Sequence, residues 1–211
     1  MSGTAQKGFL TKEMTRRQFM KISGKGLAGL ALSSSMLSLL GTTQAEVDKG
    51  AITTYAMPQG LLVVNADKCT GCRRCELNCT LVNDGSTSSY TSRIKVTRNL
   101  FSSRNGSGLY TEDHWTYYPD TCRQCEDPAC AKACPMKAIY ADENGVKLID
   151  KEKCVGCGMC TQACPWHMPT VDPVTRKSTK CIQCGACVEG CPSGALSIIP
   201  WEKVMAASQA I

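Results

Sequence analysis

All sixteen cysteines of this 211-residue chain fall into four short runs, and none lies outside them. Three runs share the spacing C-x2-C-x2-C-x3-C, whereas the second run has four residues in its middle gap. The runs are Cys69-Cys72-Cys75-Cys79, Cys122-Cys125-Cys130-Cys134, Cys154-Cys157-Cys160-Cys164 and Cys181-Cys184-Cys187-Cys191. A repeat this regular indicates that one chemical task is performed four times.

This spacing is typical of [4Fe–4S] ligation, in which three thiolates of a run bind one cluster and the fourth binds a different one. Four runs therefore supply four thiolates for each of four clusters. A proline follows the last cysteine of three runs, at Pro135, Pro165 and Pro192, where its fixed φ turns the chain. Thr80 follows Cys79 instead, so the first run is the least regular but keeps all its ligands.

Disulfides, zinc and haem are the other common uses of paired cysteines. An even cysteine count in an exported chain is compatible with a disulfide scaffold, but thiols this close in sequence seldom pair without strain. Zinc sites combine two separate C-x2-C pairs, or one pair with histidines. They do not usually place four cysteines in one short run that ends in a proline. Haem c is excluded because neither His114 nor His167 follows a C-x-x-C pair. The pattern favours iron–sulfur clusters.

Residues beside the ligands are expected to tune the clusters. Gly71, Gly156, Gly158 and Gly185 each lie within two residues of a preceding cysteine, and glycine lets a backbone amide approach sulfur closely. Lys180 comes directly before Cys181. It is either a positive charge near a cluster, which raises the reduction potential, or an ordinary solvated lysine.

The first 45 residues have the pattern of a twin-arginine export signal. The segment 15–21 reads T-R-R-Q-F-M-K, and a mild apolar stretch at 27–40 follows it. That stretch is shorter than the roughly 20 residues that span a bilayer. Residues 43–45 offer a signal peptidase site with Glu46 as the new N-terminus; an ordinary amphipathic or anchoring helix is the alternative. Because this route exports folded proteins, it suits clusters inserted in the cytoplasm, and the predicted location is the periplasm.

The charge of the chain gives no support to a nucleic-acid partner. The net charge is +6, but residues 1–45 hold six basic residues and one acidic residue, and the remainder holds 18 basic and 17 acidic residues. Each oxidised cluster with four thiolates adds about −2, so the loaded mature protein is predicted to be acidic. No further segment resembles a membrane span, so we expect membrane attachment only through a partner.

The order of the runs predicts nesting. Runs two and three are linked by a hairpin at 138–150 that turns at Asn144-Gly145, whereas runs one and four flank them, with strands 60–65 and 194–199 as expected neighbours. We also expect an irregular lead-in at 46–59, strands at 92–98 and 115–118, a turn at 104–108 and a hairpin at 168–180.

The fold class predicted is α+β, with two nested bis-[4Fe–4S] ferredoxin-like modules built from short helices and β-hairpins. The predicted divisions are a signal peptide at 1–45, the first run with inserted strands at 46–118, a bis-cluster module at 119–167 and the fourth run at 168–211.

The chain resembles the four-cluster electron-transfer (beta) subunits of the bacterial molybdenum and tungsten oxidoreductases, of the dimethyl sulfoxide reductase B and NrfC type. The resemblance rests on the segment 122–130, C-R-Q-C-E-D-P-A-C, and on Cys164-Pro165-Trp166. Within that family it is most similar to the YdhY-like ferredoxin-like proteins, through the segments 22–30 and 69–72. The resemblance covers residues 60–201.

The resemblance implies that runs one and four exchange their last cysteines, and that runs two and three do the same, as in two-cluster ferredoxins. We name each cluster after the run that supplies its first three cysteines. The implied ligand sets are Cys69, Cys72, Cys75 and Cys191 for the first-run cluster; Cys122, Cys125, Cys130 and Cys164 for the second-run cluster; Cys134, Cys154, Cys157 and Cys160 for the third-run cluster; and Cys79, Cys181, Cys184 and Cys187 for the fourth-run cluster.

The resemblance also implies a function: relaying electrons between a membrane quinol-reactive or cytochrome b-type subunit and a catalytic subunit that holds molybdopterin or tungstopterin. The implied order is first-run, fourth-run, second-run and third-run cluster, with the third-run cluster facing the membrane partner. A self-sufficient reductase is disfavoured because the sequence has no phosphate-binding glycine loop, nucleotide fingerprint or nucleophile–base pair. An assembly factor is disfavoured because full ligation predicts permanent clusters. No catalytic residue is therefore expected.

Overall fold

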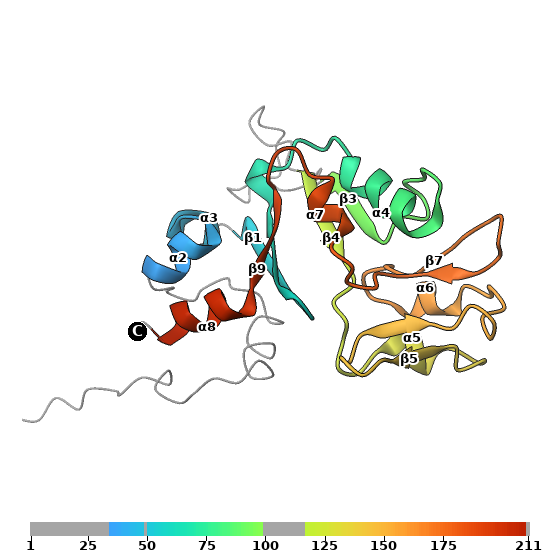
Figure 1. Cartoon of the computed structure of the whole chain (residues 1–211). Helices are drawn as coiled ribbons and strands as arrows, with labels where there is room; N and C mark the ends of the chain where they lie inside the picture. The colour runs from blue at the N-terminus through green and yellow to red at the C-terminus, as the bar shows by residue number, and fades with distance from the viewer. Residues whose placement is uncertain (1–33, 49, 99–116, 210–211) are drawn as a thin grey trace, which may run out of the picture. The chain divides into compact units, whose positions relative to one another are not determined.

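The computed structural model describes residues 34–48, 50–98 and 117–209, with side chains to residue 207, and it confirms the predicted α+β class (Figure 1). The twin-arginine segment and the expected turn at 104–108 lie outside the described residues. The protein forms two compact units, one of residues up to Val63 together with Ile199 onward, the other of Val64–Ile198. All four cysteine runs lie in the second unit. The divisions predicted at 46–118, 119–167 and 168–211 do not follow this partition and stay predictions.

A three-stranded sheet underlies the first unit. Its order is β1 (Ile52–Met57), β2 (Gly60–Asn65) and β9 (Leu196–Pro200), which confirms that the strands predicted at 60–65 and 194–199 are neighbours. The expectation of an irregular lead-in at 46–59 is wrong, because β1 occupies residues 52–57 of that segment. Four of the six β1 residues are buried without strict alternation, so the sequence lacks the period-two signal of a strand exposed on one face.

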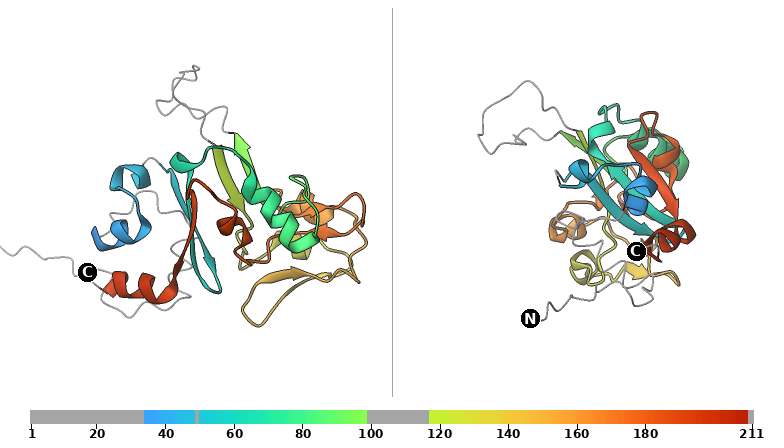
Figure 2. Two further views of the ribbon diagram at one scale, coloured as in Figure 1. Left: turned by 45° about the horizontal axis from the view of Figure 1, so that its top comes forward. Right: turned by 90° about the vertical axis from the view of Figure 1, so that its left-hand side faces the viewer.

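Three helices accompany the sheet: α2 (Ser34–Leu40), α3 (Gln44–Asp48) and α8 (Trp201–Gln209). Helices α2 and α8 lie side by side (Figures 1 and 2), and the indole nitrogen of Trp201 donates a hydrogen bond to the Met57 carbonyl at 2.8 Å. One apolar core joins helices and sheet; its buried members are Met36, Leu40, Val47, Ile52, Leu61, Val63, Ile199 and Val204.

The expected signal-peptidase bond, between Ala45 and Glu46, lies inside α3. This helix begins with a reciprocal cap, since the Thr43 amide donates to Glu46 Oε2 at 2.8 Å and the Glu46 amide donates to Thr43 Oγ1 at 3.3 Å. Upstream of that bond, Met36 and Leu40 are each only 7% exposed in the apolar core. Cleavage there removes both side chains from the core. The signal peptide stays a prediction.

In the second unit, the first half combines a helix pair with an antiparallel strand pair. Strands β3 (Ile94–Arg98) and β4 (Tyr117–Thr121) pair from Ile94↔Thr121 to Arg98↔Tyr117. They overlap the strands predicted at 92–98 and 115–118. Helix α4 (Arg74–Asp84) packs against α7 (Ala186–Glu189), to which Asn78 donates a 2.6 Å hydrogen bond at the Ala186 carbonyl. These contacts bring the first and fourth runs together.

The second half of this unit holds the inner pair of runs. Strands β5 (Ile139–Ala141) and β6 (Lys147–Ile149) form the hairpin predicted at 138–150, with Gly145 at a φ of 79° in its turn. Strands β7 (Thr170–Val171) and β8 (Ser178–Thr179) form the hairpin predicted at 168–180. Helices α5 (Ala129–Lys132) and α6 (Met159–Ala163) pack together. Outside this half, a 3₁₀ turn at Ala66–Lys68 leads into the first run.

Membrane-spanning length is not reached by any helix within 34–48, 50–98 and 117–209.

Candidate iron–sulfur centre

The four cysteine runs fold in one way. In each run the third cysteine is the second residue of a short helix, at Cys75 of α4, Cys130 of α5, Cys160 of α6 and Cys187 of α7. The first two cysteines lie in the loop before that helix. The fourth lies within α4 in run one and just beyond the end of the helix in the other three runs. The repeated sequence spacing therefore produces a repeated local geometry, as cluster loops require.

The wider gap of the second run has a local cause. In runs one, three and four the residue before the helix is left-handed, with φ of 58° at Arg73, 76° at Gly158 and 86° at Gly185. In run two that place is held by Pro128, which is extended at φ −81° and cannot be left-handed. The two additional residues in the middle gap of run two thus take the place of the left-handed turn that precedes the helix in the other three runs.

The outer runs come together at two sets of thiols. Burial raises the pKa of Cys69, and the charges of Cys191 and Cys72 add to this. Burial likewise raises the pKa of Cys75 to about 12, with further contributions from Glu76 and Cys191. The charge of Cys191 thus acts on both Cys69 and Cys75 of run one.

The reciprocal set includes the last cysteine of run one. Burial is the main reason that the pKa of the Cys187 thiol is strongly raised, and the charges of Cys181, Cys79, Cys75 and Cys184 reinforce it. Cys79 and Cys75 of run one thus both act on Cys187 of run four, so these parts of the two outer runs adjoin.

The inner runs show the same exchange. Burial raises the pKa of Cys125 and of Cys130, and in both cases the charges of Cys122 and Cys164 contribute. Cys122 and Cys164 also pack together in one buried group with Met168. The last cysteine of run three is thus placed with the first three of run two.

The last cysteine of run two lies with run three. A cavity in the second unit is lined by Cys134, Cys154, Cys157 and Cys160, together with apolar residues that include Ile139 and Ile149. The ligand sets that the resemblance implies stay a prediction.

The four sets form a linear series. The first-run and fourth-run sets adjoin through Cys75 and Cys187. The fourth-run and second-run sets adjoin through Cys181, which packs against the buried group of Cys122. Burial raises the pKa of Cys181 to about 11, and the charge of Cys122 adds to this. Cys130 and Cys160 share a buried cluster, which joins the second-run and third-run sets.

In each of the four runs, one cysteine sulfur accepts a hydrogen bond from a backbone amide. The amides of Arg93, Ala138, Ser178 and Gln183 donate to the sulfurs of Cys79, Cys134, Cys154 and Cys181, respectively, at 3.3–3.4 Å. Such bonds stabilise thiolate ligands and tune cluster potentials. Sequence reasoning missed these donors because it looked to glycines close to cysteines, whereas three of the four approach from another part of the protein or after an intervening turn.

The state and chemistry of the thiols fit clusters. All sixteen cysteines, every one of them described, are free of disulfide bonds. Within the described ranges, no three His, Cys, Asp or Glu side chains converge on the position of one metal ion. A cluster places different demands on its ligands, since each of the four thiolates binds a separate iron of the cube.

Gly156, in the loop of the third-run set, allows a specific test of this geometry. Its φ is 70°, and an added Cβ would collide with the carbonyl oxygen of Arg176. We expect Gly156→Ala to displace the loop between Cys154 and Cys157 and to lower bound iron by about a quarter, the share of one cluster in four. Iron and sulfide analysis of the purified protein measures this loss.

Gly194→Ala is the matched control. Gly194 has a φ of 65°, but nothing lies within 4 Å of an added Cβ. The Gly194→Ala variant therefore loses only the stability that a left-handed alanine costs, about 1–2 kcal/mol. It should keep its full iron content. Equal iron in both variants and the parent protein would contradict the Gly156 prediction.

Known iron–sulfur proteins match this chain over most of its length. Residues 113–200 match the family described as a 4Fe-4S dicluster domain, and residues 66–85 match a 4Fe-4S binding domain. The ferredoxin-like protein YdhY of Escherichia coli (strain K12) is 49% identical over 196 residues, which cover 90% of this chain and 93% of YdhY.

Two more distant relatives are subunits of reductases. The thiosulfate reductase electron transfer subunit PhsB of Salmonella typhi is 32% identical over 56% of this chain and 58% of its own length. The B subunit of the anaerobic dimethyl sulfoxide reductase of Escherichia coli (strain K12) is 33% identical over 50% of this chain and 52% of its own length. With its cysteine runs and the near full-length match to YdhY, this protein belongs to the YdhY-type ferredoxin-like [4Fe–4S] electron-transfer proteins, which are related to the iron–sulfur subunits of such oxidoreductases.

Proposed function

We propose that this protein carries four [4Fe–4S] clusters and relays electrons between a quinone-linked membrane subunit and a catalytic subunit that contains molybdenum or tungsten. The observation that supports it most directly is the linear series of four cysteine sets in one compact unit. When bound, a [4Fe–4S] cluster takes up and releases a single electron. The residues of the protein supply everything else: they position the sites, shield them and set their potentials.

Burial and hydrogen bonding are the two contributions of the protein. Seven of the sixteen cysteines are buried and six are partly shielded in the second unit, whereas only Cys72, Cys157 and Cys184 are exposed. Amides such as those of Ser178 and Gln183 donate to sulfur, which disperses the negative charge of thiolates held away from water.

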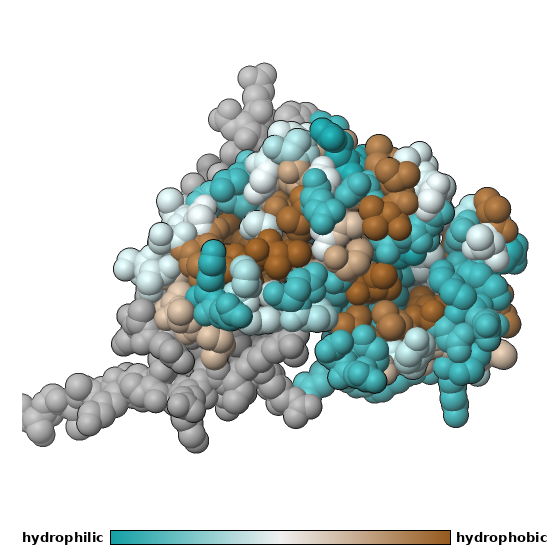
Figure 3. Space-filling view, in the orientation of Figure 1, coloured by the Kyte–Doolittle hydropathy of each residue, from teal (hydrophilic) through white to brown (hydrophobic). Residues whose placement is uncertain are grey.

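Three of the four sets have an exposed cysteine, and two of these sets are the ends of the series. Cys72 belongs to the first-run set and Cys157 to the third-run set, and both are exposed. Near Cys157, Met136 and Val155 line the same cavity and are 47% and 56% exposed. Figure 3 shows apolar residues at the surface among hydrophilic ones. Exposed apolar side chains are suited to a partner interface. Leu81 and Val82 of α4 are exposed as well, so we assign the membrane partner to the third-run end on the family resemblance.

The relatives support the choice of partners. PhsB is named as the electron transfer subunit of a thiosulfate reductase, and the other distant relative is named as part of an anaerobic dimethyl sulfoxide reductase. We propose that the catalytic partner here is likewise a molybdopterin- or tungstopterin-containing subunit. The twin-arginine pattern at 15–21 supports a periplasmic location reached by export of the folded protein.

Isolated protein tests this function. We expect about sixteen iron atoms per chain, reversible reduction by viologen dyes, and no turnover of a substrate when no other subunit is present. The physical reason is that electron relay needs only the clusters, whereas turnover needs a substrate-binding centre. Anaerobic purification followed by iron and sulfide analysis and by viologen-linked assays with thiosulfate, tetrathionate and dimethyl sulfoxide measures these quantities.

The two alternatives give different results in the same experiment. A self-sufficient reductase would oxidise reduced viologen continuously with one of the substrates. An assembly factor would transfer its iron to an apo-ferredoxin within minutes, whereas fully ligated clusters should stay with this protein.

A further inference from the structure

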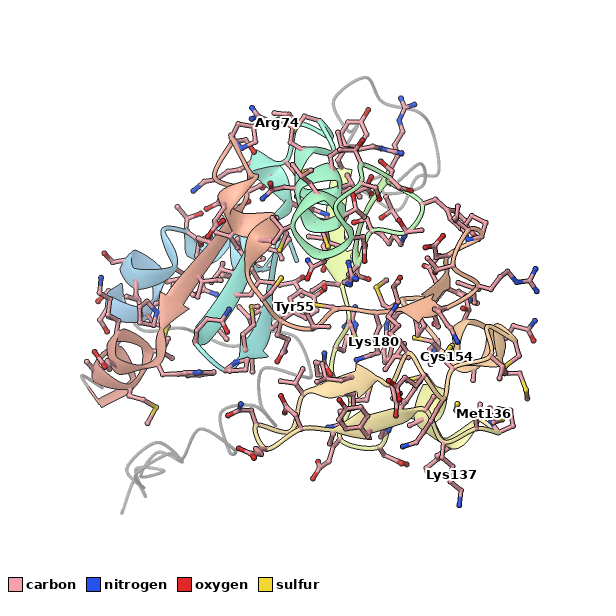
Figure 4. All side chains as sticks on the ribbon, turned by 45° about the vertical axis from the view of Figure 1, so that its right-hand side comes forward. Tyr55, Arg74, Met136, Lys137, Cys154 and Lys180 are labelled. Atoms are coloured by element: carbon pink, nitrogen blue, oxygen red, sulfur yellow. The ribbon has the colours of Figure 1, made fainter. Side chains whose placement is uncertain are left out.

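Lys180 is buried at the place where the inner and outer cysteine sets adjoin. The residue is 2% exposed, directly follows β8 and directly precedes Cys181. Figure 4 shows Lys180 in the interior of the second unit, whereas Lys137 points outward. The sequence left open whether Lys180 is a solvated lysine, and its burial excludes that interpretation.

Two acceptors hold the ammonium group of Lys180. Its Nζ donates to Gln124 Oε1 at 3.2 Å and to the main-chain carbonyl of Lys147. Gln124 is itself fixed, because its Oε1 accepts from the Lys147 amide at 2.8 Å and its Nε2 donates to the Cys181 carbonyl at 2.8 Å. One network therefore links the loop of run two, the β5–β6 hairpin and the first ligand of run four.

Cysteines of two runs flank this ammonium group. Lys180 directly precedes Cys181, and Gln124, which accepts from its Nζ and donates to the Cys181 carbonyl, lies between Cys122 and Cys125. Throughout the described part of the protein, no carboxylate forms a salt bridge with Lys180. A buried ammonium is costly unless negative charge compensates it, and the thiolates of the second-run and fourth-run sets are the source of that charge here.

We propose that Lys180 is a potential-setting residue: a fixed positive charge at the junction between the second-run and fourth-run clusters that raises the reduction potentials of both. This inference deepens the proposed function and rests on it, since the clusters must bind at these cysteine sets. An added electron makes a cluster more negative, so a neighbouring cation in a poorly screened interior stabilises the reduced form.

Potentiometric titration followed by electron paramagnetic resonance tests this role. We compare the holoprotein with Lys180→Met, which keeps the length of the side chain without charge, and with Lys180→Arg, which keeps the charge. In Lys180→Met, we expect the reduced-to-oxidised ratio of two of the four clusters to fall by about tenfold at a fixed potential, a shift of about 59 mV to lower potential. Lys180→Arg should stay within a third of that shift.

Lys132→Met is the matched control. Lys132 lies between two cysteines of run two, but its side chain is 66% exposed and pairs with Asp127 at 2.6 Å. Solvent and salt screen a charge in that position, so all four potentials should stay unchanged. Potentials that move equally in Lys132→Met and Lys180→Met would overturn a specific role for Lys180.

Lys180→Gln provides a second neutral variant in case methionine prevents folding, because its amide can still donate to the Lys147 carbonyl. Iron content separates the possible failures. If the parent protein lacks four clusters, the proposed function fails. If Lys180→Met or Lys180→Gln keeps full iron with unshifted potentials, only this inference fails. Loss of clusters in both neutral variants would assign Lys180 a purely structural role and would also overturn it.

Discussion

Cys134→Ser is expected to remove or alter the third-run cluster and to leave the second-run cluster intact. Cys134 follows α5 of run two in the sequence, but it lines one cavity with Cys154, Cys157 and Cys160 of run three. A serine oxygen is a poor substitute for a thiolate on iron, so we expect iron to fall from about sixteen toward about twelve atoms per chain. Iron and sulfide analysis with electron paramagnetic resonance measures this loss.

Two reference variants identify the affected cluster. Cys157→Ser alters the third-run set and Cys125→Ser alters the second-run set, since each of these cysteines lies in the middle of its run. The spectrum of Cys134→Ser should match that of Cys157→Ser. A match to Cys125→Ser would show that Cys134 serves its own run and that the exchange of ligands is wrong. Cys164→Ser is the mirror experiment, and its spectrum should match that of Cys125→Ser.

The Cys134→Ser variant also tests which end of the series faces the membrane partner. The third-run set lies at one end and joins the rest through Cys130 and Cys160. Loss of that end should abolish or strongly slow electron exchange with a quinol-linked partner, because electrons from that partner enter the series there. Exchange of viologen with the first-run end, at the exposed Cys72, should continue. Equal loss of both exchanges would contradict the assignment of the third-run end to the membrane partner.

Local patterns in the sequence were sufficient for the cysteine loops and for the hairpins. The spacing of each run determines a loop followed by a helix, and Asn144-Gly145 supports the tight turn between β5 and β6. Both signals act over short stretches of sequence, so no knowledge of the tertiary structure is needed. Strand β1 was missed for the opposite reason: its burial comes from neighbours distant in sequence, and its residues show no regular alternation.

The environment of the site depends on contacts between distant segments, and sequence reasoning could not supply them. Arg93 is fourteen residues beyond Cys79 but donates its amide to that sulfur, and Ser178 is 24 residues beyond Cys154. The acceptors of the buried Lys180 ammonium belong to Gln124 and Lys147, both far earlier in the sequence. Adjacency of Lys180 to Cys181 was visible in the sequence, but the desolvation that makes its charge effective was not.

The second large effect concerns export. We expect Arg16→Lys together with Arg17→Lys to abolish accumulation of the protein in the periplasm, with the precursor retained in the cytoplasm in folded, cluster-loaded form. The pair is an address read by a receptor, so lysine preserves the charge but loses the signal. Lys7→Arg together with Lys12→Arg is the matched control, because it exchanges two basic residues of the same leader and should be exported normally.

Cell fractionation with immunodetection measures the location, and iron analysis of the retained precursor shows whether clusters enter before export. Normal periplasmic levels of the Arg16/Arg17 variant would contradict the twin-arginine assignment. The intact mass of the exported protein then shows whether the bond between Ala45 and Glu46 is cleaved. Cleavage there removes Met36 and Leu40 from a core that they share with Leu61 and Val204, at a cost of about 2–5 kcal/mol for each large side chain lost. A cleaved form should therefore unfold at a lower temperature than one that keeps α2.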